Sequence, residues 1–87
     1  MTPNQRHCLA RNPNTPPEIL TKLSGDTNWG VRWEVANNHN TSPETLAKLA
    51  SEMDGWIRRR VASNPNTPHE TLTQLDALEA AYLVTDS

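Results

Sequence analysis

The stretch Arg32-Trp-Glu-Val-Ala-Asn-Asn-His-Asn-Thr-Ser-Pro-Glu-Thr-Leu46 decides the fold, because related stretches stand 26 residues before it and 26 residues after it. The earlier copy occupies residues 6–20 and the later copy residues 58–72. A fixed period of this size predicts a solenoid, in which each unit buries its apolar face only against its neighbours. Solenoids mostly present surfaces for binding, so the period also favours a binding function over catalysis.

The period divides the chain into one domain of three units. Only 34% of the 87 residues are hydrophobic and there is no Phe, so a single core would be thin and stability must come from stacking of regular local structure. The expected limits are residues 1–87 for the domain, about 2–27, 28–53 and 54–79 for the units, and about 84 for the end of a C-terminal capping helix.

The composition excludes several classes of function. The formal net charge of −2 gives no global attraction to nucleic acid or to an anionic membrane. Cys8 is the single cysteine, so we expect no internal disulfide and no thiolate metal cluster, and a reducing compartment is the simplest setting. The N-terminal residues form no signal peptide, and no apolar run approaches the length of a membrane span. These features predict a soluble, cytoplasmic protein.

Each unit contains two helices, and the sequence predicts where they begin. Thr2, Asn28 and Asp54 are good N-caps for the first helix of each unit. The second helix is expected to begin at a capping box, in which a Thr hydroxyl and a Glu three residues later satisfy each other's backbone amides. The three predicted boxes are Thr15 with Glu18, Thr41 with Glu44, and Thr67 with Glu70. The pattern leaves open whether the second helix of each unit is α or the tighter 3₁₀ form.

Apolar side chains recur on one face of each expected helix. The first helices carry pairs four residues apart followed by a small residue, and the second helices carry leucines three residues apart. The residues are Val31, Val35 and Ala36, Ile57, Val61 and Ala62, and then Leu20 and Leu23, Leu46 and Leu49, Leu72 and Leu75. An Asn column at residues 12, 38 and 64 marks the turn between the two helices, where Asn side chains are expected to satisfy turn amides.

The two ends differ from the middle of the chain. Gln5 stands where Val31 and Ile57 stand in the later units, so the outer face of the first unit is polar. Beyond residue 68 the chain has no Lys or Arg, and we expect a polar C-terminal cap of the kind that terminal repeats need. The acids in that segment are Glu70, Asp76, Glu79 and Asp86.

At these positions the chain resembles the leucine-rich repeat variant family, which is distinct from ordinary leucine-rich repeats. The motif Val-Arg-x-x-Val-Ala-x-Asn-x-Asn-Thr-x-x-Glu-x-Leu is clearest over residues 31–46 and 57–72, and the resemblance covers the chain from Thr2 to about Leu78. It implies an all-α, right-handed solenoid of alternating α and short 3₁₀ or α helices without strands, which serves as an interaction scaffold. The family's iron–sulfur domain with clustered cysteines does not carry over to a chain with one cysteine, and no cofactor is implied.

Arginines form the most informative polar pattern. Arg6, Arg32 and Arg58 occupy one column near the edge of the core, and we expect them to pair with acids such as Asp26 or Glu52, or with turn carbonyls. A ligand-facing role for this column is the alternative.

Residues 58–60 are the only cluster of basic residues. At the 26-residue offset, Arg59 falls beside Trp33 and Arg60 beside Glu34, which predicts a cation–π stack and an ion pair between units. The same residues could form a basic, aromatic patch for an acidic partner or a nucleic-acid backbone. Trp29 and Trp56 stand at helix entries, where they seal gaps between units or, if exposed, mark an interaction site. The candidate binding residues are Trp33, Arg59, Arg60, Arg58, Glu34, Trp29 and Trp56.

We expect no catalytic, cofactor or metal site. Cys8 has no fixed companion for nucleophilic catalysis, and the three histidines lack the spacing of a helical metal pair. The sequence therefore predicts a non-catalytic scaffold for protein–protein interaction. Two alternatives remain open: a nucleic-acid-binding helical module that uses Arg58, Arg59 and Arg60, and a self-assembling structural unit.

Overall fold

The chain is folded into α-helices, with no strand among the residues that the structure describes. The computed structural model describes the backbone of residues 1–85 and the side chains of residues 1–78. The helices are α1 (Pro3–Arg11), α2 (Pro17–Leu23), α3 (Trp29–Asn37), α4 (Pro43–Leu49), α5 (Gly55–Ser63) and α6 (His69–Thr85). The predicted all-helical class is confirmed, and the second helices are α rather than 3₁₀.

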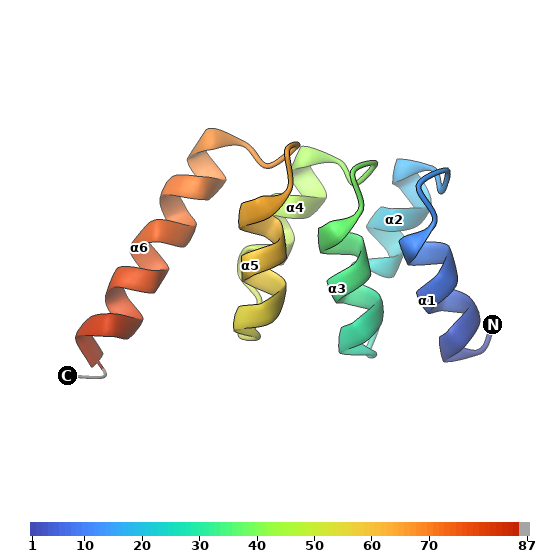
Figure 1. Cartoon of the computed structure of the whole chain (residues 1–87), viewed down its shortest axis with the longest axis horizontal. Coiled ribbons are helices and arrows are strands. Elements are labelled where there is room, and N and C mark those ends of the chain that lie inside the picture. Colours follow the sequence, from blue (N-terminus) through green and yellow to red (C-terminus); the bar gives the residue numbers. More distant parts are fainter. Residues whose placement is uncertain (86–87) are drawn as a thin grey trace.

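The helices are arranged in two rows. In Figure 1, α1, α3 and α5 lie side by side, and α2 and α4 lie behind them. Each helix in the front row packs against its predecessor in that row, and α3 and α5 also pack against the preceding helix of the rear row. The result is elongated, with extents of 43 × 23 × 15 Å.

The front-row helices begin where the sequence predicts. Thr2 forms a full capping box with Gln5: its hydroxyl accepts from the Gln5 amide, and its own amide donates to Gln5 Oε1 at 2.8 Å. The Asn28 side chain accepts from the Gly30 and Val31 amides, and the Asp54 side chain accepts from the Trp56 amide. Each of these caps satisfies amides that the first turn of a helix cannot satisfy itself.

The predicted capping boxes of the rear-row helices are wrong. α2 begins after Pro16, which cannot cap through its side chain, and α4 begins after Ser42, whose hydroxyl accepts from the Thr45 amide. The threonines that recur every 26 residues have another role. Each buried Thr hydroxyl donates a hydrogen bond back to a carbonyl near the end of the preceding helix. These bonds join Thr15 to the Leu9 carbonyl, Thr41 to the Val35 carbonyl and Thr67 to the Val61 carbonyl.

The Asn column ends the front-row helices and joins one helix pair to the next. Asn12, Asn38 and Asn64 are the C-caps of α1, α3 and α5. The Oδ1 atom of each accepts from the amide two residues later, as predicted. α3 ends at the same position as the other two although His39 replaces the proline found after Asn12 and Asn64, so the asparagine and not the proline fixes this end.

The apolar positions form one continuous core. Val31, Val35, Ile57 and Val61 are fully buried, as are Leu20 and Leu46. Ala10 and Ala36 are also fully buried where the next front-row helix crosses them, whereas Ala62 is exposed because no further front-row helix covers α5. Within the described residues, no helix combines the length and the apolar character that crossing a membrane requires.

The last helix is longer than its counterparts. α6 spans 17 residues where α2 and α4 span 7, which agrees with an extension at the C-terminal end. Its first turns keep two of the buried positions of the rear row, since Thr71 and Leu75 are 4% and 5% exposed, whereas Leu72, the counterpart of fully buried Leu46, is only half-buried. Glu79 and Asp86, two acids of the predicted polar cap, lie outside the residues whose side chains are described.

Candidate functional site

The arginine column of residues 6, 32 and 58 holds the helix pairs together. Arg6 Nε lies 2.6 Å from Asp26 Oδ2, and Arg32 Nε lies 2.7 Å from Glu52 Oε1, although the Arg32 N–H does not point at that oxygen as a hydrogen bond requires. Arg32 Nη1 also donates to the Asp26 carbonyl at 2.7 Å, and Arg58 Nη1 donates to the Glu52 carbonyl at 2.5 Å. The predicted structural role is confirmed, and Arg58, at 8% exposed, lies inside the molecule rather than on a binding face.

The Asp26 carboxylate accepts hydrogen bonds from a backbone amide and from an arginine. Its Oδ1 accepts from the Asn28 amide at 2.9 Å, and its Oδ2 accepts from Arg6. Both bonds favour the charged carboxylate, and together they lower the pKa of Asp26 below its usual value, with the Asn28 bond contributing most and the Arg6 bond next.

Two tryptophan–arginine pairs lie next to one another on α3 and α5. The guanidinium carbon of Arg60 lies 5.3 Å from the centre of the Trp33 ring, which joins the two helices. The guanidinium carbon of Arg59 lies 5.3 Å from the centre of the Trp56 ring, three residues earlier on the same helix. We call this region, with the neighbouring Trp29, the tryptophan–arginine surface. Each cation–π contact stabilises the structure by about 0.5–1 kcal/mol at an exposed site.

The predicted stacking partner of Trp33 was wrong by one residue. Arg60, not Arg59, stacks on Trp33, because Arg60 shares a helical face with Ile57 and Val61, which pack toward α3. Arg59 points away from α3 and stacks on Trp56 instead.

The predicted ion pair between Arg60 and Glu34 does not form. Glu34 shares its helical face with Val31 and Val35, which face α1, so it is buried on the opposite side of α3 from Arg60. Glu34 is 4% exposed, and its Oε2 atom is shielded from solvent with no hydrogen-bond partner in the described part of the chain. Glu34 is therefore an interior residue of the α1–α3 contact.

The rest of the tryptophan–arginine surface is open to solvent. Trp29 is 55% exposed and Trp56 is 63% exposed, so both rings lie largely outside the core. A hollow of about 240 Å³ lies beside Trp56 and is lined by Gly55, Trp56 and Arg59. Within residues 1–78, Arg59 makes no ion pair with an acid.

Two features of the molecular exterior were not predicted from the sequence. The pair of Trp56 and Arg59 has an i, i+3 spacing on one helix, and this spacing alone could have shown it. The second feature is a hollow of about 380 Å³ on the outer side of α1, at the other end of the molecule, for which the polar Gln5 was the available signal.

The described side chains include no group of three or more His, Cys, Asp or Glu residues that could hold a metal ion.

Comparison with known proteins adds no further assignment: no protein-family model, no curated protein and no solved structure matches the chain. The resemblance to leucine-rich repeat variants stays a prediction from the sequence.

Proposed function

We propose that the chain is a non-catalytic binding module: a short right-handed solenoid of three leucine-rich-variant repeats whose tryptophan–arginine surface binds an acidic face of another protein. The solenoid part of the proposal is supported by the spacing of the helices. The front-row helices begin at Pro3, Trp29 and Gly55, and the rear-row helices at Pro17, Pro43 and His69, so both rows keep the 26-residue period of the sequence.

Hydrogen bonds between the helix pairs support the same interpretation. The Asn38 side-chain amide donates to the carbonyls of Ala10 and Asn12, and the Asn64 side-chain amide donates to the carbonyls of Ala36 and Asn38. The second set of bonds is the first set moved along by 26 residues. Units that each bond to their neighbours in the same way are what define a solenoid.

The observation that carries the binding part is the exposure of two tryptophans, one of which stacks with an arginine that makes no ion pair within residues 1–78. Exposed apolar patches often mark interaction sites, and Trp and Arg are among the residues most enriched at the centres of protein interfaces. Trp56 is 63% exposed and stacks with Arg59, and Trp29 is 55% exposed at the start of α3. The arginine charge selects an acidic partner.

A protein partner fits this surface better than a nucleic acid. Nucleic-acid binding draws on many Lys and Arg contacts to phosphates. Here Arg6 and Arg32 are already paired with acids, which leaves Arg59 and Arg60 as the cations of the surface. The exposed free thiol of Cys8 suits a reducing compartment such as the cytoplasm.

The test is affinity capture from a lysate of the source cells with four immobilised chains. These are the wild type, Trp56→Ala, Arg59→Glu/Arg60→Glu, and Lys22→Glu/Lys48→Glu. The last variant is the matched control, because it changes the net charge by the same amount at exposed positions in the last turns of α2 and α4. Helical circular dichroism and the melting temperature confirm that each variant is folded.

We expect a protein that the wild type and the lysine control retain equally and that the other two variants lose, with or without nuclease treatment. Recovery that disappears after nuclease treatment would transfer the surface to the nucleic-acid alternative. Equal recovery by all four chains would show that this surface is not the binding site.

A further inference from the structure

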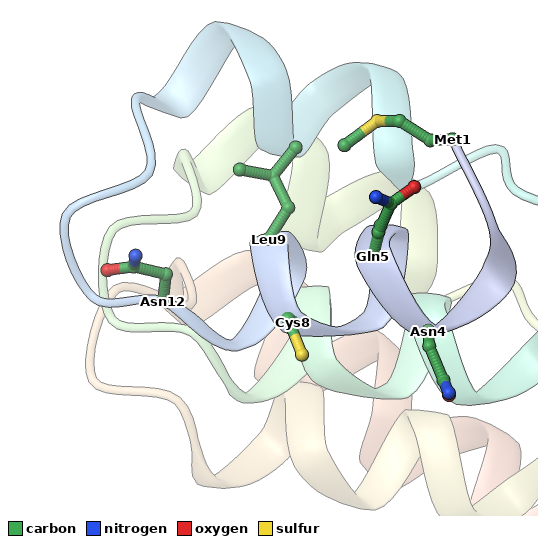
Figure 2. Close-up of a pocket in the computed structure, with 6 residues that line it drawn as sticks. All are labelled: Met1, Asn4, Gln5, Cys8, Leu9 and Asn12. Carbon is green, nitrogen blue, oxygen red and sulfur yellow. The ribbon is translucent and has the colours of Figure 1, made fainter.

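A second surface lies at the opposite end of the molecule, on the outer side of α1. Figure 2 looks onto this side of the helix and shows the hollow of about 380 Å³ with the residues that line it. They are Met1, Asn4, Gln5, Cys8, Leu9 and Asn12.

This hollow corresponds to the place where one helix pair docks on the next. At the 26-residue offset, Gln5, Leu9 and Asn12 become Val31, Val35 and Asn38. Those three residues are 0%, 0% and 6% exposed because α1 and its turn cover them. The outer side of α1 is therefore the same docking face without an occupant in the described residues.

Hydrogen-bond donors for an occupant are already in place. Asn38 and Asn64 use their side-chain amides to bind carbonyls of the preceding pair, and Asn40 and Asn66, two residues later, do the same. Asn12 stands in register with Asn38, and its Oδ1 already accepts from the Asn14 amide. Within residues 1–78 the Asn12 side-chain amide donates no hydrogen bond, so its two N–H groups are available to an acceptor on another molecule.

The matching acceptor face lies at the other end of the same chain. The carbonyls that receive the Asn amides belong to Ala10 and Asn12, and then to Ala36 and Asn38. The next pair in this series is Ala62 and Asn64.

The side chain of Ala62 is exposed, whereas Ala10 and Ala36 are fully covered. A hollow of about 160 Å³ opens there, lined by Arg58, Arg59, Ala62, Leu75 and Asp76. The first seven residues of α6 supply the rear-row helix that such a contact needs, and beyond them α6 leads away from α5 (Figure 1). The two ends thus carry complementary halves of one interface.

We propose that a second copy of this chain docks the outer side of its α1 onto the α5 end of the first, with the Asn12 side-chain amide donating to the carbonyls of Ala62 and Asn64. The contact repeats the packing of α3 on α1 and of α5 on α3. It is argued from other contacts than the tryptophan–arginine proposal, although Arg59 lines a hollow in both places. Because the two faces differ, the association is head-to-tail and continues beyond two copies.

The test uses two variants of the full chain, each blocked at one end. Gln5→Glu/Asn12→Asp keeps the oxygens that accept from Thr2 and Asn14, and places two carboxylates on the docking face. Ala62→Gln adds a larger side chain at a position that is exposed in a single copy. The corresponding alanines of the other units, Ala10 and Ala36, are fully buried, so the added side chain would block docking. The control Asn37→Asp/Gln74→Glu makes the same two chemical changes at exposed positions whose counterparts in the other units are also exposed.

Sedimentation equilibrium measures the average mass of each sample up to about 1 mM. We expect the mass of the wild type and of the control to rise with concentration, each blocked variant to remain at the mass of one chain, and an equimolar mixture of the two blocked variants to stop at twice that mass. A wild type that stays monomeric over this range would overturn the proposal. So would self-association of Ala62→Gln alone, which would show that two α1 faces meet each other instead.

Discussion

At the scale of single residues, the asparagines that join the helix pairs matter most. Asn38 is 6% exposed and its amide donates two hydrogen bonds to carbonyls of the preceding turn. Its Oδ1 holds the turn that follows. One side chain therefore ends a helix, shapes a turn and connects two units.

We expect Asn38→Asp to lower the free energy of unfolding by about 3 kcal/mol, because it removes two buried bonds and sets a carboxylate against two carbonyl oxygens. Urea denaturation measures the effect. Asn12→Asp is the matched control: it keeps the turn bond to the Asn14 amide and should change stability by less than about 0.5 kcal/mol in a dilute sample. An equal loss in both variants would refute the role of the side-chain amide.

Asp26 links stability to pH. The folded state lowers the pKa of Asp26 through the Asn28 and Arg6 bonds, so the stabilisation is fully present above the usual carboxyl pKa of about 3.9 and is lost as the pH falls below that value toward the lower, folded-state pKa. We expect Asp26→Asn to be less stable than the wild type at pH 7, and the difference to shrink as the pH falls from about 4. Thermal melts at a series of pH values check this, and a difference that stays constant down to pH 2 would contradict it.

At the scale of helices, the threonines at the start of the rear row show how one local pattern serves two structures. A Thr followed three residues later by Glu is typical of a capping box, and the spacing gave no sign that each hydroxyl would instead turn back to the preceding helix. What decides is burial: Thr41 is 1% exposed, so its hydroxyl needs a partner inside the molecule, and the Val35 carbonyl accepts from it in addition to the Asn38 amide. The sequence shows the residue types but not which backbone groups the neighbouring helix hides from water.

Two substitutions distinguish these structures. Thr41→Val should lower the free energy of unfolding by about 0.5–1.5 kcal/mol, because it removes one buried hydrogen bond while the Asn38 amide still bonds the Val35 carbonyl. Glu44→Ala should cost less than about 0.5 kcal/mol, because exposed Glu44 makes no capping-box bond. Urea denaturation of both variants decides the matter, and a loss from Glu44→Ala as large as that from Thr41→Val would restore the capping box.

The candidate site was predictable to the level of its residues but not of its contacts. Trp33, Arg59 and Arg60 were found from the 26-residue offset, which assumes that equivalent residues on neighbouring helices touch. Parallel helices instead present their flanks to each other, so Arg60, on the flank that carries Ile57, reaches Trp33. Glu34 is the clearest case: its position suggested a surface partner for Arg60, yet it faces α1.

At the scale of the whole molecule, the stack has an inside and two ends. α3 packs against α1, α2 and α5, whereas α1 has a front-row neighbour on one side only. In a molecule whose units contact only their neighbours, the terminal units open most easily.

Hydrogen exchange should therefore be slowest in α3. In dilute samples we expect the amides of α1 to exchange faster than those of α3, because α1 can detach without disturbing the α3–α5 contact. Mass spectrometry of exchanged peptides, or NMR, measures the two helices separately. Equal protection of α1 and α3 would mean that the whole chain opens as one cooperative unit.

The proposed function of the molecule depends on whether the tryptophan–arginine surface binds a protein partner. Calorimetric titration of the captured partner into the wild type, Arg59→Glu/Arg60→Glu and the charge-matched Lys22→Glu/Lys48→Glu tests it most directly. We expect the lysine variant to bind like the wild type. The arginine variant should lose about 2 kcal/mol or more of binding free energy, which raises the dissociation constant roughly 30-fold. Equal affinities for all three chains, or equal losses in both variants, would contradict the claim.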